Sequence, residues 1–413
     1  MHIGGTVFRV LLAALLCVAA WSPFAEAAGF AMYEFSARGN ALGGAMTARR
    51  ADPSSIAFNP ALVTQLEGTQ TLAGVTVVAP QVTADVNGSS TDTESNMWTI
   101  PHAYATTQIN DNLFLGVGTF SRFGLGTEFP SNWAGRAELQ SVNIQSMSVN
   151  PVLGVRNGDF AFGFGVEAMW FEYDQKQATP VGATDIDGRV KGDSTGFGLN
   201  GGAWWKATDS VALGASFRTP IKQNLEGRAT FDKNGASVPA SWFRDTDAEG
   251  SVTLPGEVRV GVAWEPDDRW SVAMDVTRTF WSSYDELRIS YGDPLAPGVT
   301  ESVKTTEWRD VWRLGLGVEY RLTDMVDLRA GYVYDCEPVN PDHLDFLVPA
   351  NDRQLYSLGV GLHDGPWRVD VSYTYLWIKG RDGEVRSDDG TVYDVRFHDG
   401  DAHLVGLSAG WEF

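Results

Sequence analysis

"PWRVDVSYTYLW", residues 366–377, alternates between two kinds of side chain. The odd-numbered positions are all apolar or aromatic: Trp367, Val369, Val371, Tyr373, Tyr375 and Trp377. The positions between them are mostly polar: Arg368, Asp370, Ser372, Thr374 and Leu376. A period of two residues predicts a β-strand with one apolar and one polar face. Aromatic residues at both ends of the apolar face are typical of strands that cross a membrane in a β-barrel.

The same alternation recurs along the second half of the chain, in "EVRVGVAW" (257–264), "VWRLGLGVEYR" (311–321), "LYSLGVGL" (355–362) and "HLVGLSAGWEF" (403–413). A soluble β-sandwich also alternates, so the number and pairing of the strands must decide between the two folds. Short turns such as "RNGD" (156–159) and "HDGP" (363–366) join neighbouring strands into pairs. Longer polar stretches separate the pairs: 80–97, 120–140, 176–193, 226–250, 285–306, 336–351 and 380–400.

Fourteen spans follow from this division of the chain. They start near residues 69, 98, 112, 141, 159, 194, 210, 251, 269, 308, 325, 352, 366 and 402. An even number of strands, with short turns at one end and long loops at the other, is typical of outer-membrane barrels. The predicted fold is therefore all-β, a closed antiparallel transmembrane barrel.

The first 27 residues have the composition of an export signal. Arg9 precedes the apolar stretch "VLLAALLCVAA" (10–20), and Ala25-Glu26-Ala27 fits a cleavage site. An uncleaved anchor is the alternative, and a lipoprotein at Cys17 is disfavoured because bulky Leu16 precedes it. No later apolar run reaches the roughly 18 residues that a membrane-spanning helix needs.

Charge and residue content exclude several classes of function. The chain has 52 Asp and Glu residues against 31 Lys and Arg, which disfavours nucleic acid as a partner. Once Cys17 is removed, Cys336 is the only cysteine, so the sequence predicts neither a disulfide within the chain nor a metal centre built on cysteine and histidine. No cofactor-binding or nucleotide-binding motif is present. We find no Ser, His and acid grouping that indicates catalysis.

The stretch "DPSSIAFNPALVTQL" (52–66) interrupts this pattern just before the first strand. Small residues dominate the segment from Ala28 up to this point. Pro60 fixes its own φ angle and disfavours a helical conformation for Asn59. An ordinary proline turn before a strand is the simplest interpretation of Asn59-Pro60-Ala61 from these residues alone.

Several motifs occur in an order that resembles one known family. They are "AGFAMYEFSARGNALGGAM" (28–46), "NPALVTQL" (59–66), "FSRFGLGTEF" (120–129), "LPGEVRVGVAW" (254–264), "WSSYDELRI" (281–289), "WRDVWRLGLGVEY" (308–320) and "LRAGYVYDCEPV" (328–339). The mature chain resembles, from end to end, the FadL family of long-chain fatty acid transporters in the Gram-negative outer membrane. The resemblance implies a fourteen-stranded barrel (67–413) whose lumen is closed by an N-terminal hatch (28–66). It also implies a monomer that passively imports long-chain fatty acids or other hydrophobic small molecules, such as aromatic hydrocarbons.

The resemblance further implies a gate. In the family the third strand kinks inward beside the hatch and leaves a hole in the wall, through which ligand leaves sideways into outer-membrane lipid. Gly124 and Gly126 match that strand, and Asn59, Pro60 and Ala61 match the hatch segment beside it. Glycine inside a strand often marks a bend, although these two glycines could equally ease barrel curvature.

The resemblance also implies ligand-binding residues. Phe30 matches a phenylalanine of the family's internal pocket, Lys304 matches one of its basic positions, and Lys176 lies next to another, where Gln177 is aligned. An outer loop that first captures ligand in the family matches a stretch containing Phe123, Leu125, Phe129 and Trp133. The second capture loop (176–193) is short here, which leaves the capture groove in question.

Two other functions remain open at this stage. A general diffusion porin would show a large, stable conductance and would not need an apolar plug. An outer-membrane lipid hydrolase would need a catalytic grouping that the sequence does not reveal.

Overall fold

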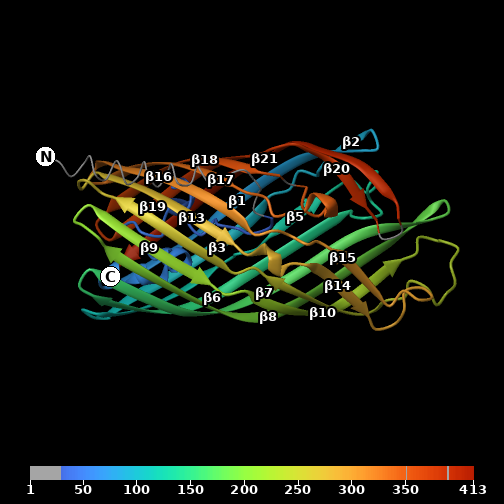
Figure 1. Ribbon diagram of the computed structural model, residues 1–413, viewed down its shortest axis with the longest axis horizontal. Coiled ribbons are helices and arrows are strands. Elements are labelled where there is room, and N and C mark those ends of the chain that lie inside the picture. The colour runs from blue at the N-terminus through green and yellow to red at the C-terminus, as the bar shows by residue number, and fades with distance from the viewer. Residues whose placement is uncertain (1–28, 350, 388–389) are drawn as a thin grey trace.

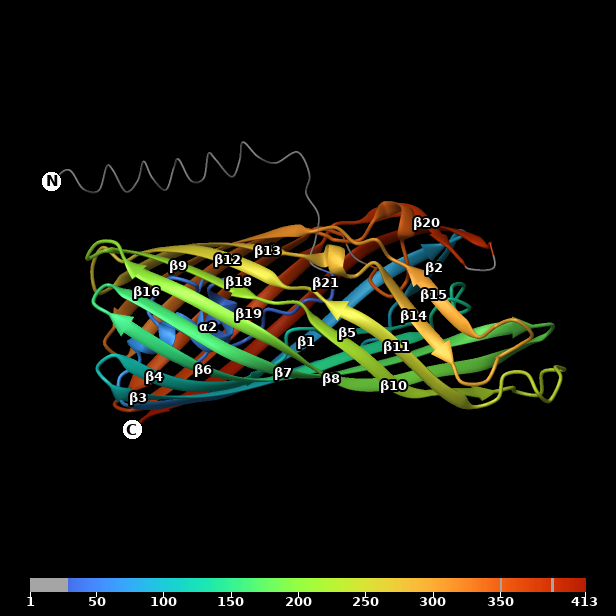
Figure 2. The same ribbon diagram turned by 60° about the horizontal axis from the view of Figure 1, so that its bottom comes forward.

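The computed structural model describes residues 29–349, 351–387 and 390–413. They form one closed antiparallel barrel with an N-terminal segment inside it (Figures 1 and 2). The strand segments are β1 (Thr69–Val86), β2 (Ser89–Asp92), β3 (Trp98–Asn110), β4 (Leu113–Phe120), β5 (Leu125–Glu128), β6 (Ser141–Asn157), β7 (Phe160–Val181), β8 (Thr184–Lys206), β9 (Val211–Arg218), β10 (Ile221–Asp232), β11 (Thr246–Leu254), β12 (Glu257–Trp264), β13 (Trp270–Thr279), β14 (Glu286–Tyr291), β15 (Glu301–Thr305), β16 (Val311–Thr323), β17 (Val326–Asp335), β18 (Arg353–Asp364), β19 (Trp367–Ile378), β20 (Arg381–Arg386) and β21 (Val392–Glu412). The helical segments are α2 (Ala37–Ala41), α3 (Ser55–Phe58) and the 3₁₀ turns η1 (Pro60–Gln65), η2 (Trp281–Ser283) and η3 (Pro341–His343).

The pairing of these segments yields fourteen wall strands, as the sequence predicts. Seven wall strands consist of two segments each: β2 with β3, β4 with β5, β9 with β10, β11 with β12, β13 with β14, β15 with β16, and β19 with β20. The ring closes between β1 and β21, where Leu72 lies opposite Gly410 and Val77 opposite Val405. Closure pairs the first wall strand with the last, so the sheet does not end in two free edge strands.

Burial along the wall is inverted relative to a soluble protein. On β19 the inward-facing Asp370, Ser372 and Thr374 are 1–3% exposed, whereas the outward-facing Trp367 and Val371 are 55% and 46% exposed. Other outward-facing side chains are also large and apolar, including Phe164, Phe197 and Leu358. The two faces predicted from residues 366–377 are confirmed, with the apolar face turned outward.

Two of the stretches predicted as long loops, 176–193 and 380–400, are largely strand. β7 and β8 continue through residues 176–193 to a tight turn, with Val181 opposite Thr184. β10 pairs with this extension, and β20 pairs with the start of β21 within residues 380–400. The expected starts at residues 194 and 402 are therefore about ten residues late. The extended parts of these strands carry many polar side chains, which pair with one another; Arg189, for example, bonds Asp174 at 2.5 Å. Their polar composition is therefore similar to that of a loop.

The segment before β1 fills one end of the ring (Figure 2). It contains α2, α3 and η1, and most of its residues are buried. At η1, Asn59 is extended (φ −151°, ψ 106°), its side-chain oxygen accepts a hydrogen bond from the Ala61 N–H at 3.1 Å, and Pro60 begins the turn. Asn59-Pro60 thus acts as a capped start of a helical turn.

Backbone of this segment touches backbone of the wall. A Cβ added at Gly315 or Gly317 would lie 2.4 Å from the carbonyl oxygen of Gly43 or Leu42. The small residues on both sides therefore permit a contact that larger residues would prevent. The described residues include no helix that is both long and apolar enough to cross a membrane. The predicted signal peptide (1–27) lies outside the described residues.

Candidate functional site

The third wall strand is interrupted between β4 and β5. β4 pairs with β3 on one side and with β6 on the other. β5 pairs with β6 alone, and pairing of β3 with β4 stops at Ala103. Within the described part of the wall, Trp98–His102 therefore have a strand partner only on the β1 side. Toward the outer loops, the break ends where the Glu94 N–H donates to the Glu128 carbonyl oxygen at 2.8 Å.

The residues between β4 and β5 bond the N-terminal segment on one side and a β6 side chain on the other. The Met32 N–H donates to the Arg122 carbonyl oxygen at 2.8 Å, and the Gly124 N–H donates to the Phe30 carbonyl oxygen at 3.0 Å. The Ser146 hydroxyl donates to the Phe123 carbonyl oxygen at 2.7 Å. These bonds satisfy backbone groups that would otherwise be buried without partners. The strand consequently bends inward where the sequence places Gly124.

At Gly124 and Gly126 there is no room for a larger side chain. A Cβ at Gly124 would lie 2.7 Å from the Met32 methyl carbon, and one at Gly126 would lie 2.0 Å from the indole ring of Trp98. Neither glycine has a positive φ angle. Gly124 thus faces the N-terminal segment, whereas Gly126 and Trp98 face each other across the break.

A cavity of about 510 Å³ lies at this break. Its lining includes the buried Phe30 and Ile144, which face the lumen, and also Gln145 and Met147 on the outward face of β6. About half of the remaining lining is apolar: Ala31, Met32, Val78, Pro80, Val82, Met97, Trp98, Ile100, Pro101, Phe123, Leu125, Trp170, Val348, Pro349, Leu355, Leu376, Ile378, Ala402 and Leu404. Because residues from both faces of the wall line it, the cavity extends through the wall.

Three of the six charged side chains in this lining, Arg313, Asp335 and Arg353, form one group. Arg353 donates to Asp335 at 2.7 Å, and the Arg313 Nε lies 3.8 Å from the same carboxylate oxygen. The Arg313 guanidinium also stacks on Tyr33, 4.2 Å from the ring centre. The sequence prediction did not name either arginine as a residue of the cavity. The available signal was their position on lumen-facing sites of otherwise apolar strands.

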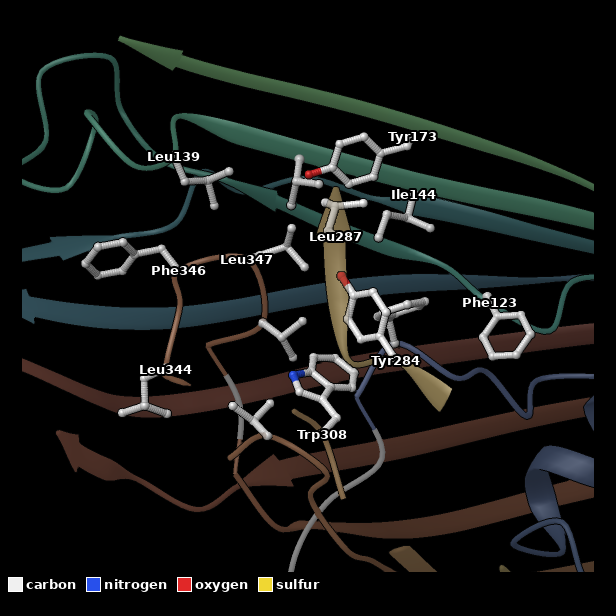
Figure 3. Packing of buried hydrophobic residues seen from close by; sticks show 14 of the residues in the cluster. Phe123, Leu139, Ile144, Tyr173, Tyr284, Leu287, Trp308, Leu344, Phe346 and Leu347 are labelled. Atoms are coloured by element: carbon white, nitrogen blue, oxygen red, sulfur yellow. The ribbon is translucent and has the colours of Figure 1, made fainter. Parts of the chain in front are cut away.

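Phe30 lies in an aromatic cage deep in the barrel. Its ring centre is 4.8 Å from that of Trp281, 5.6 Å from that of Trp308, 5.7 Å from that of Tyr284 and 6.0 Å from that of Phe123. Figure 3 shows Phe123, Tyr284 and Trp308 in one cluster with Leu139, Ile144 and Leu347. The residues come from the bent third strand, from the interruptions between β13 and β14 and between β15 and β16, and from outer loops, so only folding brings them together.

The two predicted lysines do not join Phe30. Lys304 lies on β15, with its ammonium 3.6 Å from the Glu138 carboxylate. Lys176 is exposed on the extension of β7. Neither lines the cavity. The structure therefore does not bring Phe30, Lys304 and Lys176 together in one cavity, and a role of the lysines in binding stays a prediction.

The residues predicted to form the gate lie in two separate places. The Asn59 amide donates to the carbonyl oxygens of Thr47 at 2.8 Å and Ala203 at 3.0 Å, and Pro60 and Ala61 press against Gly163 of β7. None of these three residues lines the cavity, whereas Gly124 and Gly126 do. The part of the N-terminal segment that meets the bend is residues 30–32 instead.

Residues predicted to form an outer capture surface are mostly buried. Phe123 belongs to the cage around Phe30, and Leu125 starts β5. Phe129 and Trp133 stack at 3.8 Å, and Trp133 contacts Phe346 at 4.9 Å between ring centres. The Thr127 hydroxyl donates to the Leu347 carbonyl oxygen at 3.1 Å. The segment around Phe346 and Leu347 thus covers the outer end of the apolar interior (Figure 3).

Buried ion pairs hold the N-terminal segment in place. Arg38 of α2 donates to Asp52 at 3.1 Å and to Glu319 of β16 at 2.8 Å. Burial would raise the pKa of Asp52, but Arg368 and Arg38 outweigh it and lower that pKa below its usual value. Farther along the lumen, Arg218 donates to Glu167 and to the backbone carbonyls of Ile56 and Ala57. The segment is therefore tied to several wall strands.

Comparison with known proteins yields consistent matches over nearly the whole chain. The family model described as "Outer membrane protein transport protein (OMPP1/FadL/TodX)" matches residues 17–413. The long-chain fatty acid transport protein of Escherichia coli K12 is 25% identical over 420 residues, covering 88% of this chain and 90% of the relative. The 47 kDa outer membrane protein of Pasteurella multocida is 26% identical over 432 residues, covering 98% of both chains.

Solved structures share the fold. A FadL homologue of Pseudomonas aeruginosa superposes with a TM-score of 0.82 at 22% identity, covering 94% of this chain and 100% of that chain. The toluene transporter TodX of Pseudomonas putida superposes with a TM-score of 0.74 at 18% identity, covering 92% of this chain and 98% of that chain. Both neighbours therefore share the fold of this chain, and only the second is named for a transported compound.

Proposed function

Since the chain belongs to the OMPP1/FadL/TodX family of outer-membrane transport proteins, and is thus a transporter rather than an enzyme, we propose that it imports long-chain fatty acids or similar hydrophobic molecules. Transport is passive, and ligand leaves sideways through the break between β3 and β5 into outer-membrane lipid. In this proposal residues 1–27 are the export signal, 28–66 the hatch and 67–413 the barrel, which works as a monomer.

The observation that carries this proposal is the cavity that extends through the wall. Its lining combines lumen-facing residues such as Ile144 with outward-facing residues such as Met147. An acyl chain gains about 0.8 kcal/mol for each CH₂ group that it transfers from water to hydrocarbon. A sideways route keeps that chain against apolar surface throughout, whereas an axial route would expose it to periplasmic water.

The attachment of the hatch also favours a sideways route. Arg38, Asp52 and Glu319 are an ion-paired group with side-chain exposures of 5%, 1% and 12%. Separating such a group leaves buried charges without partners, which typically costs about 3–5 kcal/mol. The bend at Gly124 requires no displacement of this group, because it meets only residues 30–32.

Uptake by cells tests the proposal. Radiolabelled oleate and radiolabelled toluene are supplied to an outer-membrane transport-deficient strain with and without the protein, at matched levels of folded barrel. We expect faster uptake of at least one compound when the protein is present. Equal uptake of both compounds by both strains would reject import of hydrophobic molecules as the function.

A further inference from the structure

We propose that Arg122 is a positioning residue for the sideways passage: its buried ion pair with Glu167 holds the third wall strand in its inward bend. This inference rests on the proposed import through the break and adds the residues that keep the break open. Neither residue is part of the cavity lining. Arg122 therefore acts through the backbone of the bend and not on the ligand.

The bend contains one residue more than the strand beside it. β4 ends at Phe120, opposite Ser148 of β6, and β5 starts at Leu125, opposite Ile144. The residues between these two pairs are four on the third strand and three on β6, namely 121–124 and 145–147. An extra residue of this kind is a β-bulge, which bends its strand. It also exchanges the two faces, so β4 turns its even-numbered residues inward and β5 its odd-numbered ones.

Contacts inside the barrel fix the Arg122 side chain, which is 4% exposed. Its Nη1 donates to the Glu167 carboxylate at 3.2 Å, and its Nη2 donates to the Pro255 carbonyl oxygen at 3.4 Å. The guanidinium also lies 5.1 Å from the ring centre of Phe123. Glu167 is itself held by the Ser148 hydroxyl, which donates to it at 2.6 Å. The bend is therefore anchored to β7 and to the residues between β11 and β12.

The backbone of Arg122 meets the hatch. Its carbonyl oxygen accepts a hydrogen bond from the Met32 N–H at 2.8 Å, and the Gly124 N–H donates to the Phe30 carbonyl oxygen at 3.0 Å. One residue thus joins the bend to the wall through its side chain and to the hatch through its backbone. Loss of the side chain would leave the hatch bonds as the main restraint on the bend.

Five charged side chains form an alternating row behind the bend. The row consists of Arg122, Glu167, Arg218, Glu257 and Arg259, with successive N–O distances of 3.2, 2.7, 3.8 and 3.0 Å. Each of them is at most 5% exposed. Three cations share two carboxylates in this row, so removal of either terminal arginine leaves equal numbers of the two charges. The two ends differ in position, because Arg122 belongs to the bend and Arg259 to β12.

The open edge of β3 provides the competing arrangement. In the described wall, Trp98–His102 have a strand partner only on the β1 side. A straight third strand that kept the register of β3 and β4 would bring Ser121 opposite Pro101. Pairing there would satisfy backbone groups at the break and close the passage. The ion pair of Arg122 opposes this closure.

Replacement of the two terminal arginines by methionine tests the role of Arg122. Arg122→Met and Arg259→Met each remove one buried cation, keep apolar contact with a neighbouring ring and leave two arginines with two glutamates. We expect Arg122→Met to lower oleate uptake severalfold at normal levels of folded barrel, and Arg259→Met to import oleate as the wild type does. Arg122→Lys retains the charge and should recover most of the uptake.

Disulfide formation between β3 and the third strand measures closure of the wall directly. Pro101→Cys and Ser121→Cys are introduced together, with Cys336→Ser to prevent wrong pairing. Residues directly opposite each other in paired strands lie within reach of a disulfide. We expect little cross-linking in this background alone or with Arg259→Met, and severalfold more with Arg122→Met. If Arg122→Met does not fold, Arg122→Gln takes its place and should shift both measurements in the same direction.

The outcomes separate the role of Arg122 from the transport function. Equal cross-linking with Arg122→Met and Arg259→Met, or wild-type uptake by Arg122→Met, would overturn the positioning role. If cross-linking rises with Arg122→Met but the wild type gives cells no uptake, the positioning role stands and the proposed function fails. If the wild type imports oleate and the two methionine variants lose uptake equally, the function stands and the positioning role fails.

Discussion

At the scale of single residues, glycine has two different uses in this barrel. Gly315 and Gly317 lie against hatch carbonyl groups, where any side chain would collide with backbone. Gly124 and Gly126 lie at the break in the wall, where an added Cβ would meet the side chains of Met32 and Trp98. Side chains can move aside more easily than backbone. Substitution at the break should therefore change the passage without preventing folding.

The double variant Gly124→Val/Gly126→Val tests the passage. Valine also favours a straight, paired strand, so both its volume and its β propensity oppose the bend. We expect the barrel to reach normal levels in the outer membrane and oleate uptake to fall severalfold. The matched control is Gly188→Val/Gly250→Val, because these strand glycines have their nearest neighbours at 3.2 and 3.1 Å and lie outside the cavity lining. Normal uptake by the first variant would show that ligand does not leave here.

At the scale of elements, the hatch is held by contacts that differ greatly in burial. Arg38 pairs with Asp52 and Glu319 where all three side chains are largely buried. Arg50 pairs with Glu265 at 2.9 Å, but its side chain is 45% exposed. Buried pairs are costly to break from one side, whereas exposed pairs contribute little. The hatch should therefore depend on Arg38 far more than on Arg50.

Substitution of these two arginines by alanine measures that difference. We expect Arg38→Ala to lower the free energy of unfolding by about 3–5 kcal/mol and Arg50→Ala to lower it by less than about 1 kcal/mol. Denaturant unfolding in detergent, together with protease sensitivity of residues 29–66, provides the measurement. Similar values for the two variants would mean that the Arg38 group does not anchor the hatch.

At the scale of the whole molecule, the barrel is a closed wall around a filled interior. The N-terminal segment occupies one end (Figure 2), and Phe346 and Leu347 pack into the apolar cluster around Tyr284 and Trp308 (Figure 3). An ion moving along the axis would have to displace both. The sideways passage is apolar and therefore unfavourable for ions.

Conductance in planar bilayers tests this whole-molecule property. We expect the wild type to show no large, stable open state, because the interior is packed. A variant lacking residues 29–66 should show conductance typical of an open barrel if it folds, and Arg38→Ala should show transient openings. A large, stable conductance of the wild type would instead identify a general diffusion porin.

Much of this architecture was predictable from local pattern. The alternation in residues 366–377 determined which side chains face lipid, because successive residues of any strand point to opposite sides. The order of turns and strands determined the fourteen-stranded wall, and Asn59-Pro60 determined a break in regular strand. Strand ends were predicted less well, since Val181 and Thr184 are strand only because they pair with each other.

The arrangement of the site was decided by tertiary structure. Phe30 meets Trp281 and Trp308, residues more than two hundred positions away, while Lys304 meets Glu138 instead of Phe30. Arg313 and Arg353 join Asp335 because β16, β17 and β18 are neighbours in the closed ring. The sequence by itself determined the wall, since a period of two is a local property of the backbone. Only the closed barrel decided which charges share a cavity, because that depends on the register between strands and on where the hatch leaves space.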